Sequence, residues 1–98
     1  MTVAELLDSP EKWTKEMSSR DENGHYVEYD SARAVCWCLD GAIARCYSAD
    51  QWERAWDAIS EAITELYGNE RPCETVSFND HTGTTFADIR RVIEKAGV

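Results

Sequence analysis

Residues 49–67, ADQWERAWDAISEAITELY, decide the fold because they separate apolar and acidic side chains onto two faces of one predicted helix. At about 100° per residue, side chains three or four positions apart lie on the same face of an α-helix. The apolar face carries Trp52, Trp56, Ile59, Ile63 and Leu66. The opposite face, here called the acidic ridge, carries Asp50, Glu53, Asp57, Glu61 and Glu65. We therefore expect a long amphipathic helix whose apolar face lies in a core.

The acidic ridge is the candidate partner-binding site of the sequence. Only Arg54 interrupts it, and Glu61 and Glu65 stand one turn apart, where like charges cost about 0.2–0.5 kcal/mol. Acids one turn apart repeat at about 6 Å, which is comparable to the spacing of phosphates along a nucleic acid strand. The ridge therefore predicts contact with a groove lined by Lys and Arg, where charge complementarity governs on-rate and specificity. The alternative is that this face serves only solubility.

The excess of acids restricts the class of partner. The 98 residues include 19 acids and 10 bases, which gives a formal net charge of -9. Phosphate backbones and anionic membranes repel such a chain, so we expect a basic protein partner and no direct contact with nucleic acid or membrane. With 43% hydrophobic residues the chain fits a single domain, residues 1–98. No apolar run approaches the roughly 20 residues of a membrane span, and Met1 to Asp8 have no positively charged region before an apolar stretch, so we expect a cytoplasmic location.

Two further helices are expected before the long one. Thr2 and Glu5 have the spacing of a capping box, which predicts a short N-terminal helix to about Asp8. A central helix is predicted over residues 32–47, because apolar residues recur at helical spacing there. Gly41 falls in its interior, where Gly costs about 1 kcal/mol relative to Ala. Such a glycine favours a neighbour that packs closely against the helix backbone.

The chain after the long helix combines turn signals with one more helix. Residues 75–78 are short and β-prone, and residues 79–83 have turn chemistry. Thr84 or Thr85 caps a last amphipathic helix that ends near Gly97.

The segment from about residue 13 to residue 29 carries a hairpin signal. Asn23-Gly24 favours a tight turn between antiparallel strands, and Val27 and Tyr29 alternate with polar neighbours behind it. The competing interpretation is an ordered loop, because residues 18–20 have little to bury. The fold class is therefore mainly α, a small bundle of three main helices plus a short N-terminal helix, with a β-hairpin or ordered loop at about 13–29.

Several motifs together resemble those of an uncharacterised family of small bacterial and phage proteins, a domain of unknown function. The motifs are Trp13-Thr14, residues 35–43 (VCWCLDGAI), Phe78-Asn79-Asp80 and Thr84-Thr85. The resemblance implies a Cys-Trp-Cys-Leu-x-Gly-Ala helix and a later aromatic-Asn-Asp turn before the last helix. It implies a fold and a mobile-element or actinobacterial background, and no activity.

The thiols do not predict a metal or a catalytic centre. Cys36 and Cys38 are two positions apart on the predicted central helix, hence about 200° apart, and cannot grip one ion. Neither Cys38 nor Cys46 is expected at a helix start, where a thiol pKa would be lowered. Small buried residues are the favoured interpretation, and Cys73 is the thiol expected to be accessible. We expect no metal, no cofactor and no disulfide.

Asn79, Asp80 and His81 form the alternative ligand site. An amide, a carboxylate and an imidazole on one loop suit a small enzyme or ligand-binding module in which Asp80 orients His81. The competing interpretation is that Asn79 and Asp80 bond the loop backbone and help the last helix to begin. No second acid or nucleophile is placed to complete a mechanism, so we expect no catalytic residue.

The sequence thus favours a non-enzymatic acidic protein that blocks or modulates a basic, nucleic-acid-binding partner protein. Phage-encoded inhibitors of host defence, such as anti-CRISPR or anti-restriction proteins that act as DNA mimics, are the concrete example of this class. The alternative is the enzyme or ligand-binding module at residues 79–81.

Overall fold

The long helix has the bounds that its sequence pattern predicts. The structure is a computed structural model that describes all residues 1–98, and its helix α3 spans Ala49–Tyr67. The carbonyl of Thr64 accepts the amide of Gly68, whose positive φ of 59° ends the helix.

Four shorter helices and two short strands complete the fold, together with 3₁₀ turns at Pro10–Lys12 and Gly68–Glu70. The helices are α1 (Val3–Leu6), α2 (Leu39–Cys46), α4 (Thr75–Asp80) and α5 (Phe86–Ala96). The strands β1 (Ser19–Arg20) and β2 (Cys36–Trp37) are antiparallel. This confirms a mainly α fold, in which α2, α3 and α5 are the main helices and α1 is the short N-terminal one.

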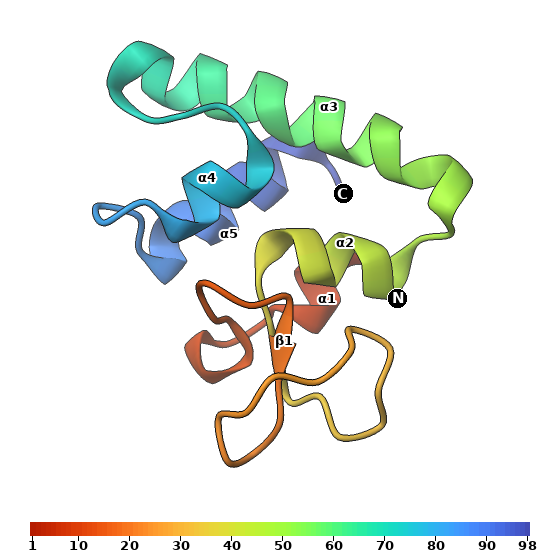
Figure 1. Cartoon of the computed structure of the whole chain (residues 1–98). Coiled ribbons are helices and arrows are strands. Elements are labelled where there is room, and N and C mark those ends of the chain that lie inside the picture. Colours follow the sequence, from red (N-terminus) through yellow and green to blue (C-terminus); the bar gives the residue numbers. More distant parts are fainter.

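The helices enclose one apolar core. Figure 1 shows α3 along one side of the molecule, α4 and α5 beside it, and the irregular segment between α1 and α2 on the opposite side. Fifteen buried apolar residues from all five helices and β2 form a single cluster. None of the helices is both long enough and apolar enough to cross a lipid bilayer.

The buried face of α3 differs from the prediction at one edge. Ile59 and Ile63 are fully buried as expected, and Ala55 and Ala62 join them. Trp56, however, is 38% exposed. It stands at the border of the apolar face, and its indole N–H donates to Asp40 of α2 at 2.7 Å. The assignment of Trp56 to the core was therefore wrong.

The segment before α2 is an ordered loop that contains a small turn. The chain reverses at Asn23-Gly24, where Gly24 has a φ of 82° and the amide of Asp21 donates to the carbonyl of His25. The longer pairing of β1 is with β2, in the register Ser19↔Trp37 and Arg20↔Cys36. The turn was predicted correctly, but the main partner of β1 is the strand β2, which lies outside residues 13–29.

The predicted central helix begins seven residues later than expected, at Leu39 instead of Ala32. Residues 36–37 pair with β1, and Cys38 is the N-cap whose sulfur accepts the amide of Gly41. The family-like motif in residues 35–43 therefore spans a strand, a cap and a helix, and is not one helix. Gly41 does meet a close neighbour, because a Cβ there would overlap the carbonyl oxygen of Ser18.

Residues 75–80 form α4 and not a strand followed by a turn. The carboxylate of Glu74 accepts the amides of Val76 and Ser77 at 3.0 Å each, which supplies a cap that outweighs the β propensity of the segment. Asn79 and Asp80 consequently lie at the end of a helix.

Candidate functional site

The acidic ridge is a continuous exposed row along α3. All five of its carboxylates are exposed. Glu65 pairs with Lys95 at 3.2 Å, and Asp50 accepts the hydroxyl of Ser48 next to the helix start. The other three have no hydrogen bond or ion pair within the chain; they are Glu53, Asp57 and Glu61. The centre of the ridge is therefore negative and unpaired.

Asn79, from the alternative site, is a buried structural residue. It is 0% exposed, and its side-chain oxygen accepts the indole N–H of Trp13 at 2.7 Å and the amide of Leu39 at 2.9 Å. Its side-chain nitrogen donates to the carbonyl of Thr14 at 3.1 Å and to Asp80 at 2.9 Å. All hydrogen-bonding positions of the amide are thus used inside the protein.

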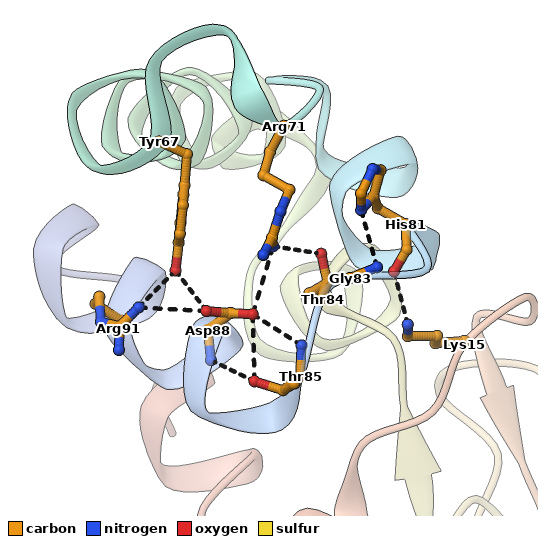
Figure 2. Close-up of polar contacts among 9 residues, drawn as sticks. All are labelled: Lys15, Tyr67, Arg71, His81, Gly83, Thr84, Thr85, Asp88 and Arg91. Atoms are coloured by element: carbon orange, nitrogen blue, oxygen red, sulfur yellow. Dashed lines mark hydrogen bonds and ion pairs between the residues drawn. The ribbon is translucent and has the colours of Figure 1, made fainter.

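Asp80 and His81 are also engaged with the chain and do not contact each other through hydrogen bonds. Asp80 accepts the amide of Glu16 at 2.9 Å. The His81 ring accepts the amide of Gly83 at 3.0 Å, and the backbone carbonyl of His81 accepts a hydrogen bond from Lys15 Nζ at 2.7 Å (Figure 2). None of the surface cavities is lined by these two residues or by Asn79.

The structure contains a polar cluster around Asp88 that the sequence analysis did not predict. Asp88 lies in the first turn of α5, its side chain is 12% exposed, and its two oxygens accept hydrogen bonds from the end of α3, from the segment before α4 and from the N-cap of α5 (Figure 2). Tyr67 at the end of α3 donates at 2.8 Å, Arg71 at 3.4 Å and the Thr85 amide at 2.9 Å. The spacing of Thr85 and Asp88 is that of a capping box, and it was the one local signal for this cluster.

The cluster keeps its carboxylate ionised. Burial acts to raise the pKa of Asp88, but hydrogen bonds from the Thr85 amide and from the Tyr67, Thr85 and Arg71 side chains outweigh it and lower the pKa to about 2. Burial and the bond to Asp88 raise the pKa of the Tyr67 hydroxyl. Every partner is internal, so the cluster fastens the end of α3 to the start of α5.

Two of the four cysteines, Cys36 in β2 and Cys38 at the N-cap of α2, lie outside the helix that was predicted to carry them. Cys38 does sit at a helix start, contrary to the prediction, but burial raises its pKa to about 11. Burial also raises the pKa of Cys46. Cys73 is exposed, as predicted. No cluster of three His, Cys, Asp or Glu side chains has a geometry that could hold a metal ion.

Comparison with known proteins places the chain in a family. No curated protein and no solved structure is significantly similar to it. A family model matches residues 2–97, almost the whole chain, and confirms that the chain belongs to an uncharacterised family. The chain therefore belongs to the family of unknown function DUF6197.

Proposed function

We propose that this protein is a non-enzymatic acidic binding protein that blocks or modulates a basic, nucleic-acid-binding partner protein in the cytoplasm. The observation that carries the proposal is the acidic ridge, whose central carboxylates are exposed and unpaired on one straight helix. A phage-encoded inhibitor of host defence, such as an anti-CRISPR or anti-restriction DNA mimic, is the specific form that this function takes in our proposal.

The physical basis is the match between a row of carboxylates and a surface that binds phosphates. Acids four residues apart repeat at about 6 Å along an α-helix, so the ridge repeats its charges at a distance similar to that between successive phosphates. A groove lined by Lys and Arg attracts such a row at long range, and close charge pairs then fix its register. Occupation of that groove excludes nucleic acid from it.

The geometry gives no support to the alternative site at residues 79–81. Asn79 has no free polar atom, and no cavity lies beside Asp80 or His81. These residues tie α4 to the N-terminal segment, which is a structural role.

The test is capture of a partner by the tagged protein from a cell lysate at low and at high salt. In the ridge variant, Asp57→Asn, Glu61→Gln and Glu65→Gln are combined. The control variant combines Glu22→Gln, Glu28→Gln and Asp30→Asn, which removes the same charge from exposed acids outside the ridge. We expect the ridge variant to lose about tenfold or more in affinity, and the control variant to lose much less. The captured protein should also be displaced by DNA.

The same assay separates the two candidate functions. Asp80→Ala should leave partner capture intact, and raised salt should weaken capture by the original protein, since exposed charges are screened over roughly 8–10 Å at physiological ionic strength. If the ridge variant captures its partner as well as the original protein does, the proposed function is wrong.

A further inference from the structure

A surface groove with an aromatic wall lies beside the acidic ridge. It has a volume of about 420 Å³ and is bounded by the first turn of α2, the middle of α3 and the segment that enters α4. We call it the Trp56 groove; its lining residues are Asp40, Trp56, Asp57, Ser60, Cys73, Glu74, Thr75 and Val76. This volume suits a side chain with its flanking backbone better than a single ion.

Trp56 is held in the groove with its ring partly open to solvent. Its indole N–H is already satisfied by Asp40 at 2.7 Å, so the side chain is fixed without any external hydrogen bond. Its ring is 6.3 Å from that of Trp52, between centroids. Val76, 41% exposed, adds an open apolar surface to the same groove. A fixed exposed indole next to an exposed valine is typical of a contact surface for a partner.

The charges around this apolar surface are of one sign. Asp40, Asp57 and Glu74 line the groove, and no Lys or Arg does. None of the three carboxylates is in an ion pair. The Ser77 hydroxyl and the first amides of α4 lower the pKa of Glu74, so it remains ionised at neutral pH. Charge complementarity therefore calls for a cationic occupant.

We propose that the Trp56 groove binds an arginine side chain of the basic partner, with the guanidinium against the Trp56 ring and the surrounding carboxylates. Arginine fits better than lysine because its planar, weakly hydrated guanidinium both stacks on aromatic faces and pairs with carboxylates. Its methylene stem suits the apolar surface of Val76.

The groove is continuous with the acidic ridge. Asp57 belongs to both, and Ser60 is shared with a second depression that Glu61, Thr64 and Glu65 complete. An arginine anchored beside Trp56 would thus place neighbouring cations of the same segment along the ridge. This inference rests on the proposed function and adds a chemically specific anchor to it.

The test compares three peptides that carry four arginines, four lysines or four neutral citrullines at the same positions of a Gly-Ser chain. Binding to the whole protein is measured by calorimetry at low salt. We expect the arginine peptide to bind about three- to tenfold more tightly than the lysine peptide, and the citrulline peptide to bind least. In Trp56→Leu the preference for arginine over lysine should disappear.

A matched variant separates the groove from the ridge. Glu53→Gln with Glu61→Gln removes two ridge charges outside the groove, and should weaken both cationic peptides while preserving the preference for arginine. Equal binding of arginine and lysine peptides by the original protein would overturn the groove proposal and leave the ridge function standing. Absence of binding by either peptide would also overturn the groove proposal, while the function itself is judged separately by partner capture.

A second measurement needs no substitution. The exposed Cys73 thiol lines the groove, so the arginine peptide should slow its alkylation by iodoacetamide, as read by mass spectrometry. An unchanged rate at saturating peptide would overturn the proposal. Sedimentation tests whether a second copy of the chain occupies the groove instead. If the protein forms a dimer that Trp56→Leu dissociates, the groove belongs to the dimer interface and the arginine proposal is overturned.

Discussion

Asp88 shows how a single side chain can connect two helices. Its carboxylate accepts the Tyr67 hydroxyl and the Thr85 amide, and it also pairs with Arg91 at 3.2 Å. Asp88→Asn keeps the shape of the side chain but removes its charge. Since the pKa falls from 3.8 to about 2 on folding, ionised Asp88 contributes about 2 kcal/mol to stability at neutral pH. We expect Asp88→Asn to lose roughly this amount in urea unfolding at pH 7.

The pH dependence gives the matching control. A carboxyl whose pKa is lowered by folding stabilises the protein above the unfolded value of 3.8, and that stability is lost as pH falls through about 2. The difference in unfolding free energy between the original protein and Asp88→Asn should therefore shrink between about pH 4 and pH 2. Asp8→Asn, on an exposed pair with Lys12, should leave stability nearly unchanged, because exposed ion pairs are well screened by water. A constant difference across this pH range would contradict the role of Asp88.

The four cysteines should react in the order of their exposure. Cys73 is exposed, whereas Cys38 is buried and burial raises its pKa to about 11. The thiolate is the reactive form, so a thiol reagent at pH 8 should label Cys73 first and Cys38 last. Peptide mapping after timed alkylation measures the order. Early labelling of Cys38 would mean that the first turn of α2 opens readily.

At the scale of elements, Gly41 controls how α2 meets the N-terminal segment. Ala normally favours a helix over Gly by about 1 kcal/mol. Here a Cβ would overlap the carbonyl oxygen of Ser18. The same oxygen accepts the amide of Cys38 at 3.1 Å, so it cannot move away freely. We expect Gly41→Ala to destabilise the protein by about 1–3 kcal/mol, the usual cost of overpacking. Thermal unfolding measures it, and a stabilised variant would show that propensity outweighs this contact.

The apolar face of α3 provides a second prediction at this scale. Ile59→Ala should cost about 2–5 kcal/mol, because Ile59 is fully buried and its truncation leaves a cavity. Glu53→Ala, on the exposed face of the same helix, should change stability by less than about 0.5 kcal/mol. Chemical denaturation tests both. A cost for Ile59→Ala as small as that for Glu53→Ala would place the core elsewhere.

These elements also show what sequence can predict. The bounds of α3 followed from local periodicity, and the caps at Thr2 and Thr85 from local side-chain chemistry. The start of α2 could not be predicted from local sequence, because residues 36–37 pair with residues 19–20 as a strand. The same holds for the site: the ridge lies on one helix and was predictable, whereas the Trp56 groove needs α2, α3 and α4 together.

For the whole molecule, most basic side chains are engaged in contacts within the chain, whereas the central acids of the ridge are not. The side chain of every Lys and Arg except Arg33 and Arg54 donates a hydrogen bond or joins an ion pair within the chain. Arg90, for example, donates to the carbonyls of Ala4 and Leu7 at 2.7 and 3.2 Å. The three central carboxylates of the ridge, Glu53, Asp57 and Glu61, therefore lack ion-pair partners within the chain.

This uneven distribution predicts that the ridge opposes folding. Combining Glu53→Gln, Asp57→Asn and Glu61→Gln changes the formal net charge from -9 to -6 and removes three like-charged pairs at four-residue spacing, Glu53/Asp57, Asp57/Glu61 and Glu61/Glu65. Each such pair costs about 0.2–0.5 kcal/mol, so the variant should be more stable than the original protein by roughly 0.6–1.5 kcal/mol at low salt. In about 1 M NaCl, where charges are screened beyond roughly 3 Å, the gain should disappear. Urea unfolding at both salt concentrations measures this difference. A variant that is less stable at low salt would mean that the ridge serves the fold. A stabilised variant that has lost its partner would show that the ridge weakens folding in exchange for binding.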